Sequence, residues 1–260
     1  MSTSLMGVPL ASLSERETVD RVLGGLARAA GGWVCPINLD VLRQVDASLD
    51  IRALVERADL LVADGMPLVW ASHLRGAPLP ERVAGSALVH SLSIAAARER
   101  RSIFLLGGNP GAAEAAAARL VEEAPELIVA GTLCPPMGFE HDVSELAEIE
   151  RVLLDAKPDI VFVGLGFPKQ ELLATHLRPL LPRTWFLSCG ISFSFVSGEI
   201  LRAPRLVQRL GLEWLHRLAQ EPRRLARRYL VDGLPFLARM LADALRERRA
   251  GDIAGSANSP

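Results

Sequence analysis

A single acidic residue, Asp64, follows a short apolar run and precedes Gly65-Met66-Pro67. A carboxylate at the end of a strand can serve as a general base that takes a proton from an attacking hydroxyl. Gly65 allows a tight turn, and Pro67 suits the first turn of a following helix. Asp64 could instead cap that helix, which is the commoner use of Asp before a helix. The motif alone leaves both roles open.

Two glycine-rich stretches could bind an anion. The stretch Gly164–Glu171 (GLGFPKQE) is typical of a phosphate-binding turn that enters a helix, where backbone N–H groups and Lys169 would favour negative charge. It is neither a complete GxGxxG fingerprint nor a Walker loop, because Lys169 occupies the third glycine position. A plain strand-to-helix turn with a solvated Lys169 and Glu171 fits equally well. The stretch Gly107–Gly111 indicates only a turn.

The residue types do not favour a metal site. None of the five His has the HExxH or HxH spacing, and Cys35, Cys134 and Cys189 lie far apart without a CxxC pair. The sequence also lacks an Asp-x-Asp pair, the usual clamp for a metal-bound nucleotide diphosphate. Arg, Lys and backbone N–H groups would then have to balance the charge of such a substrate. We therefore expect no metal and no other cofactor.

Arginine is concentrated near the C-terminus. Residues 201–250 hold 12 Arg, no Lys and five acidic residues, whereas the whole chain has a formal charge of −1. The planar guanidinium can bind two oxygens of a diphosphate at once. Leu210, Trp214 and Leu218 follow helical spacing, which together with the Arg favours a segment that lies on an anionic membrane surface. Ordinary amphipathic helices with solvated Arg are the alternative.

These residues need a scaffold to position them. Helix-patterned stretches near 16–30, 40–57, 85–100, 110–123, 144–156 and 169–180 alternate with six apolar runs. The runs are Trp33–Ile37, Asp59–Ala63, Ile103–Gly107, Leu127–Thr132, Ile160–Gly164 and Trp185–Cys189. This alternation predicts an α/β fold, a Rossmann-like, mostly parallel sheet with helices on both faces. The residues that end or follow the runs would meet at the carboxyl edge, where ligands bind. They are Asn38, Asp64, Gly107, Gly164 and Gly190.

We expect three parts along the chain. Residues 1–200 form the α/β domain, residues 201–250 a helical appendage with a break near Gly233-Leu234-Pro235, and residues 251–260 a disordered tail. A pI near 6.5 argues against nucleic-acid binding. The N-terminus lacks a signal-peptide pattern, and no apolar run is long enough to span a membrane. We expect a cytoplasmic protein that associates peripherally with the inner face of the cell membrane.

Read in order, motifs spread over about residues 33–230 resemble the WecG/TagA/CpsF family of glycosyltransferases. The matching pieces are Asn38, Ala63–Trp70, Arg82–Ser86, Phe104–Gly108, Pro135–Phe139, Lys157–Asp159, Gly164–Glu171, Arg202–Pro204, Glu213–Leu215 and Glu221–Arg223. The resemblance implies an inverting transfer from a nucleotide-diphosphate sugar, with UDP favoured, to a saccharide on a polyprenyl diphosphate. Such transfers serve the synthesis of cell-surface polysaccharides.

The resemblance also implies roles for single residues. Residues 1–200 would bind the nucleotide sugar, and Asp64 would be the catalytic base. The candidate substrate-binding residues are Asn38, Arg82, Gly107, Gly164, Gly166, Lys169, Gln170, Glu171, Gly190 and Arg202, with Arg217, Arg224, Arg227 and Arg228 directed at the acceptor diphosphate. The appendage would dock on the membrane and bring these last arginines to the acceptor.

Two positions depart from the family pattern. Pro36 stands where the family usually has Thr, and Ala87 stands where it commonly has Asp. Both could lie near the sugar, so the donor sugar stays open, as does an altered activity. Two other functions also stay open: an inactive membrane-docked scaffold, and a Rossmann-type oxidoreductase, which would need a complete glycine fingerprint. The chain could also form a homo-oligomer.

Overall fold

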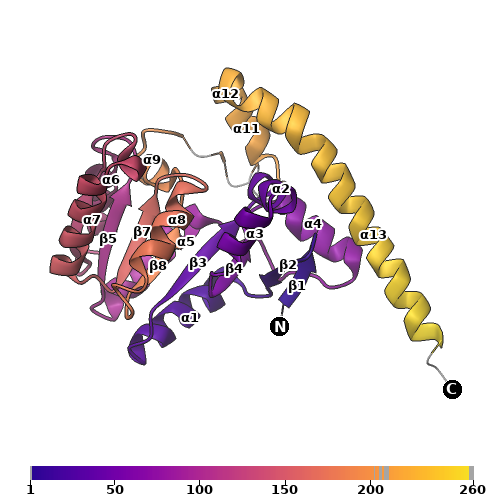
Figure 1. Ribbon diagram of the computed structural model, residues 1–260, viewed down its shortest axis with the longest axis horizontal. Helices are drawn as coiled ribbons and strands as arrows, with labels where there is room; N and C mark the ends of the chain where they lie inside the picture. The colour runs from indigo at the N-terminus through magenta and orange to yellow at the C-terminus, as the bar shows by residue number, and fades with distance from the viewer. Residues whose placement is uncertain (1, 202, 205–206, 208–210, 258–260) are drawn as a thin grey trace.

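The computed structural model describes residues 2–201, 203–204, 207 and 211–257. Its centre is a sheet of six parallel strands (Figure 1). The strands are β3 (Gly32–Ile37), β4 (Leu60–Ala63), β5 (Ser102–Gly107), β6 (Ile128–Leu133), β7 (Ile160–Gly164) and β8 (Trp185–Ser188), arranged in the order β4-β3-β8-β7-β5-β6. The expected parallel α/β fold is confirmed, and each expected strand lies within a residue or two of an observed one.

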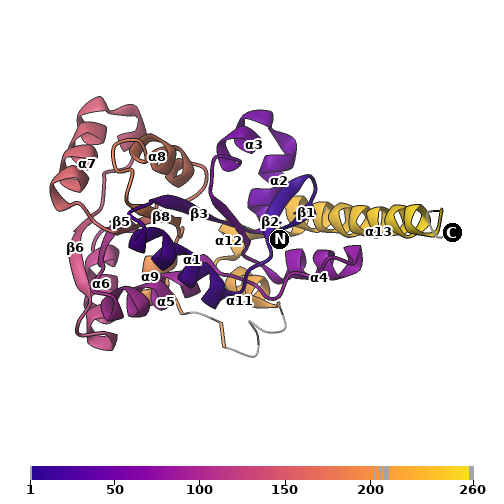
Figure 2. The same ribbon diagram turned by 90° about the horizontal axis from the view of Figure 1, so that it is seen from below.

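Helices cover both faces of the sheet (Figure 2). One face carries α1 (Glu15–Ala27), α5 (Gly85–Arg98), α6 (Ala112–Glu123) and α9 (Ser192–Val196), and the other carries α2 (Leu39–Ala47), α3 (Leu49–Val55), α7 (Val143–Ala156) and α8 (Lys169–Leu177). Side chains alternate between the two layers, so that Val34 and Val62 pack on the first face, whereas Cys35 and Ala63 pack on the second. Because both faces are covered, the strands are almost continuously apolar.

The helix expected over 40–57 is divided in two. Ser48 has an extended backbone (φ −141°), and its hydroxyl accepts a hydrogen bond from the Ile51 N–H at 3.4 Å. Ser48 therefore ends α2 and caps α3, an arrangement that helical periodicity alone did not reveal.

A hairpin that the sequence did not predict precedes α1. Strands β1 (Ser2–Leu5) and β2 (Val8–Ala11) pair antiparallel around Met6 and Gly7, which both have positive φ, as a tight hairpin turn requires. The hairpin buries Leu5, Val8 and Leu10 in the core next to α4 (Met66–Arg75). It extends the core beyond β4, at the end of the sheet where the C-terminal helices dock.

The C-terminal segment is helical and packs on this end of the body. It comprises α11 (Glu213–Gln220), α12 (Pro222–Ala226), a π-helical segment η2 (Arg227–Gly233) and α13 (Leu234–Ala257), which lies along α4 (Figure 1). The break expected near Gly233-Leu234-Pro235 is instead this π-helical segment, which carries the chain into α13. Helix α13 is described to Ala257, and residues 258–260 of the expected disordered tail lie outside the described part of the chain.

Apolar contacts and ion pairs both hold the appendage. Phe236, Met240 and Ala244 of α13 are buried in the main core. The ion pairs are Arg82–Glu213 at 2.5 Å, Arg75–Glu247 at 2.9 Å, Asp40–Arg228 at 3.1 Å, and Asp46–Arg239. Within the described ranges, the search for a helix both long and apolar enough to cross a membrane finds none.

Candidate active site

The candidate site lies where the chain changes sides of the sheet. Strands β3 and β8 are neighbours at the centre, yet β3 leads into α2 on one face and β8 leads into α9 on the other. In parallel sheets such a switch point is where ligands bind. Asn38 follows β3, Gly190 follows β8, and Asp64 follows the adjoining strand β4. The expected gathering of these residues at the carboxyl edge is therefore observed.

Asp64 is held by the backbone around it. Its N–H donates to the Ile37 carbonyl at 2.8 Å, which prolongs the pairing of β3 with β4 by one residue. Its Oδ2 accepts a hydrogen bond from the Gly85 N–H at 3.3 Å, at the start of α5. Helix α4 begins after Gly65 and has no side-chain cap, so Asp64 does not cap the helix that follows it. The carboxylate instead faces the N-terminus of α5.

Asn38 has a structural role that its position did not reveal. Its Oδ1 accepts hydrogen bonds from the N–H groups of Asp40 and Val41, each at 3.0 Å, and thereby caps α2. The amide oxygen is thus engaged within the protein. A contact from Asn38 to a substrate would have to come from its NH₂ group, which can only donate.

The candidate glycines fall into two kinds. Gly107 and Gly164 allow two turns to touch: the Gly108 N–H donates to the Gly164 carbonyl at 2.8 Å, and a Cβ at Gly107 would lie 2.7 Å from that oxygen. By contrast, a Cβ at Gly166 or at Gly190 would have no neighbour within 4 Å. Both have positive φ and adjoin open space, so their backbones can be approached by a ligand.

Lys169 is paired within the protein. Its ammonium group contacts the carboxylate of Glu140, which lies in the short helix η1 (Phe139–His141). The hydrogen bond from Lys169 lowers the pKa of Glu140, which keeps the pair ionised. Lys169 is still about 44% exposed, so a substrate phosphate would have to compete with Glu140 for it. Helix α8 begins here without a side-chain cap, but the N–H groups of Gln170, Glu171 and Leu172 already donate to the carbonyls of Gly166 and Pro168.

Gln170 and Glu171 lie below the surface. Gln170 is 7% exposed and Glu171 is 1% exposed. The Gln170 Oε1 accepts from the Gly190 N–H at 3.0 Å, and its Nε2 donates to the Glu171 Oε1 at 2.8 Å. Glu171 is therefore buried beneath the carboxyl edge, and its part in substrate binding stays a prediction. Burial raises the pKa of Glu171 to about 7.

Comparison with known proteins decides among the functions that the sequence left open. A model of the family "Glycosyl transferase WecG/TagA/CpsF family" matches residues 3–250. The chain belongs to this family. It is also 30% identical over 194 residues, which are 75% of this chain and 73% of the relative, to a protein of Bacillus spizizenii (strain ATCC 23059 / NRRL B-14472 / W23). That relative is named N-acetylglucosaminyldiphosphoundecaprenol N-acetyl-beta-D-mannosaminyltransferase. The chain is thus a glycosyltransferase, which removes the oxidoreductase alternative.

The appendage of the transferase brings arginines to the carboxyl edge. Arg217 of α11 stacks over the ring of Phe195 in α9, with 5.7 Å between guanidinium carbon and ring centroid. Arg228 pairs with Asp40 in the first turn of α2. Arg82, only 17% exposed, pairs with Glu213 at the start of α11. Three of the candidate arginines therefore lie next to elements that follow β3, β4 and β8.

The other candidate arginines are placed differently or lie outside the description. Arg227 is exposed to solvent. Arg224 belongs to α12, but its side chain is not among those described, and Arg202 lies outside the described residues. The acidic partners Glu140, Asp40 and Glu213 were not recognised as such in the sequence. Only Asp40 carried a local signal, because it stands in the first turn of a capped helix.

The two departures from the family pattern flank the contact of Asp64 with α5. A Cβ at Gly85 would lie 3.4 Å from Cγ of Pro36, and Ala87 is half-buried in the first turn of the same helix. Strand β3 pairs with β8 only over Gly32–Val34, so Pro36 lies beyond that pairing. Both departures therefore lie in the surroundings of the candidate base.

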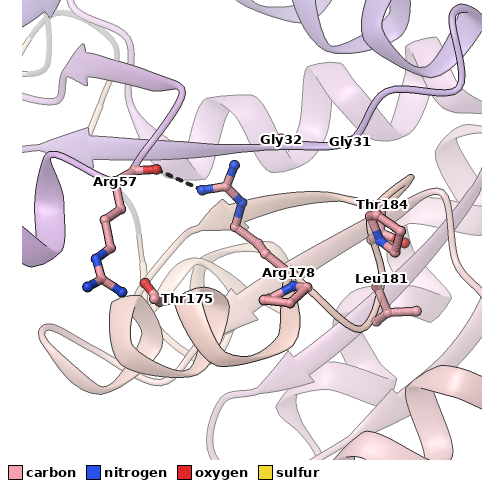
Figure 3. A pocket seen from close by; sticks show the side chains of 9 residues that line it. Gly31, Gly32, Arg57, Thr175, Arg178, Leu181 and Thr184 are labelled. Atoms are coloured by element: carbon pink, nitrogen blue, oxygen red, sulfur yellow. Dashed lines mark hydrogen bonds between the residues drawn. The ribbon is translucent and has the colours of Figure 1, made fainter.

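A separate cavity lies at the opposite end of the sheet. It has a volume of about 440 Å³ and is bordered by Gly31, Gly32, Arg57, Thr175 and Arg178, among others (Figure 3). These residues precede or flank the amino ends of β3, β4 and β8. Arg178 donates to the Arg57 carbonyl at 2.7 Å and pairs with Asp59. Among the candidate site residues whose side chains the structure describes, none borders this cavity.

A search for metal sites finds no group of three or more His, Cys, Asp or Glu side chains suitably placed within the described ranges.

Proposed function

We propose that this glycosyltransferase moves a sugar, with inversion, from a UDP-sugar to N-acetylglucosamine carried on a polyprenyl diphosphate. The printed name of the Bacillus spizizenii relative supports this acceptor. The observation that carries the proposal is the place of Asp64 at the switch point, with its carboxylate fixed by the Gly85 N–H. The product would enter the synthesis of a cell-surface polysaccharide.

The reaction is one displacement. The acceptor hydroxyl oxygen attacks the anomeric carbon, its proton passes to Asp64, and the bond from that carbon to the diphosphate oxygen breaks. The electron pair of that bond leaves with the nucleoside diphosphate. The partly exposed Lys169 and the backbone near Gly166 and Gly190 would stabilise the leaving group, together with Arg82. In this scheme no metal or other cofactor takes part.

The appendage would serve the acceptor. Arg217 and Arg228 lie at the carboxyl edge, where they can approach the acceptor diphosphate. The same segment exposes Leu215, Leu230 and Val231 to solvent. Exposed arginines accompany these side chains, and each basic residue near an anionic leaflet contributes about 1 kcal/mol of binding. We therefore place the enzyme peripherally on the inner face of the cell membrane.

A donor panel tests this proposal. Purified enzyme is incubated with N-acetylglucosaminyl diphosphate on a short polyprenol and with UDP-, GDP- or dTDP-sugars that include UDP-N-acetylmannosamine, with and without EDTA. We expect transfer from one UDP-sugar, unchanged by EDTA. Loss of transfer in EDTA would overturn the metal-independent scheme. Donor binding without transfer to any lipid acceptor would instead favour the inactive scaffold.

A further inference from the structure

A buried polar cluster lies directly beneath the carboxyl edge. Gln170 and Glu171 enter it from α8, Cys35 from β3, and Ser188 from the end of β8, and all four are buried. Polar groups in such a place need partners, because an unsatisfied buried group costs about 1–3 kcal/mol. Trp33 satisfies Ser188 through its indole N–H at 3.0 Å. The cluster is therefore organised, and it adjoins the switch point.

The hydrogen bonds of the cluster run in one direction. The Gly190 N–H donates to Gln170, and the Gln170 amide nitrogen donates to Glu171. An ionised carboxylate can only accept, so it requires the NH₂ group of Gln170 to face it. The amide oxygen then faces the Gly190 N–H. Glu171 thus determines which way the amide points, and the amide determines whether the turn after β8 is held.

The ionisation of Glu171 can change near neutral pH. Its Oε2 is buried and has no hydrogen-bond partner among the described atoms, and its Oε1 lies 3.9 Å from the Cys35 sulfur. Burial raises the pKa of the carboxyl group to about 7, against the hydrogen bond from Gln170, which favours the charged form. The nearby thiols of Cys35 and Cys189 have pKa values raised by burial, so they stay neutral in this range.

We propose that Glu171 is a positioning residue that acts through Gln170 to hold the Gly190 turn in the shape that receives the donor. Gly190 is suited to this contact, because its positive φ and the open space beside its Cα leave the backbone accessible. The ionised carboxylate holds the turn best, and a protonated carboxyl group allows the Gln170 amide to rotate. The effect on the donor rests on the proposed transfer reaction, whereas the effect on the turn does not.

The first test measures the turn in the absence of ligand. Protein labelled with ¹⁵N-glycine reports the Gly190 N–H by NMR, and its hydrogen exchange is corrected for the intrinsic rate at each pH. In Glu171→Leu we expect the protection of Gly190 to fall about fivefold, which corresponds to the loss of one hydrogen bond. In Glu171→Gln it should stay at the wild-type value for low pH, because the neutral amide, like the protonated carboxyl group, can donate as well as accept and no longer fixes the Gln170 amide.

A control variant separates positioning from loss of stability. Leu173→Ala removes a buried apolar side chain from the same helix and should destabilise the protein while leaving the protection of Gly190 unchanged. The proposal fails if Glu171→Leu folds with normal protection at Gly190. If Glu171→Leu does not fold, the pH series decides: in wild type the Gly190 resonance should titrate near pH 7, and in Glu171→Gln it should not. A wild-type resonance that is constant across this range would overturn the proposal.

The second test measures transfer. We expect the KM for the donor to fall as pH rises through 7 in wild type and to be independent of pH in Glu171→Gln. In Glu171→Leu the KM should be raised about fivefold with a smaller change in kcat. Equal pH profiles in wild type and Glu171→Gln would contradict the link to the donor. If wild type transfers no sugar at all, the proposed function fails, and the Gly190 measurement still decides the role of Glu171.

Discussion

The α/β domain and the C-terminal appendage both place candidate residues at the carboxyl edge of the sheet, but different interactions hold those residues there. Asp64 is fixed by backbone hydrogen bonds to Ile37 and Gly85, within two continuous apolar layers. The appendage buries few side chains and depends on ion pairs such as Arg82–Glu213. The more exposed of these pairs, such as Arg239–Asp46, contribute little each, about 0–1 kcal/mol. The position of the candidate base is therefore set by the core of the α/β domain, whereas the positions of the appendage arginines depend on weaker contacts between the appendage and that domain.

The sharpest test of the body is Asp64→Asn. If Asp64 is the base, turnover should fall about 10³-fold, since general-base catalysis contributes 10²- to 10⁴-fold. Donor binding, measured by thermal shift, should persist, because Asn can still accept from the Gly85 N–H. The matched control is Asp155→Asn on the exposed face of α7. Near-normal turnover of Asp64→Asn would show that Asp64 is not the catalytic base.

The next effect concerns stability and pH in the body. Glu171 has a pKa of about 7 in the folded protein against 4.5 as its ordinary value, so the folded state binds the proton more tightly. Its contribution to the free energy of unfolding therefore falls as pH rises from about 4.5 to about 7. Glu171→Gln cannot ionise, so its free energy of unfolding does not decrease in this way. At pH 8 the variant should be more stable than wild type by at most about 3 kcal/mol. Urea unfolding of both proteins at pH 5 and pH 8 checks this, and an equal difference at both pH values would contradict it.

A smaller effect should appear in the appendage. Glu213→Gln weakens the pair with Arg82 and should release α11 together with Arg217. We expect transfer to the lipid acceptor to fall about fivefold, with little change in the melting temperature. Asp155→Asn, on the exposed face of α7, is again the control. A variant with normal transfer would show that α11 is held by its apolar contacts alone.

The smallest expected effect is that of salt. Raising NaCl from about 0.05 M to about 0.5 M shortens the screening length to a few Å and weakens exposed pairs. Amide hydrogen exchange should then increase in α11 and α12, but not in the strands of the sheet. Equal responses in both regions would show that appendage and body open as one unit.

The sequence revealed the sheet more fully than the site. Buried parallel strands are long apolar runs, which is why β3 to β8 could be predicted, and the carboxyl edge with them. The β1–β2 hairpin was missed because two four-residue strands carry little periodicity. The burial of Gln170 and Glu171 was missed because their motif reads as a solvated turn. Pairs such as Asp46–Arg239 depend on how α13 docks, and no local pattern encodes a contact between residues so far apart.

Helix α13 also has a practical consequence. Its 24 residues form one uninterrupted rod of about 36 Å, which begins near α12 and extends past the body along α4 (Figure 1). A fluorophore attached near its far end would be kept at a set distance from the catalytic edge. Energy transfer from that fluorophore to a labelled bilayer would report how the enzyme is tilted on the membrane surface, without any change to a residue of the site.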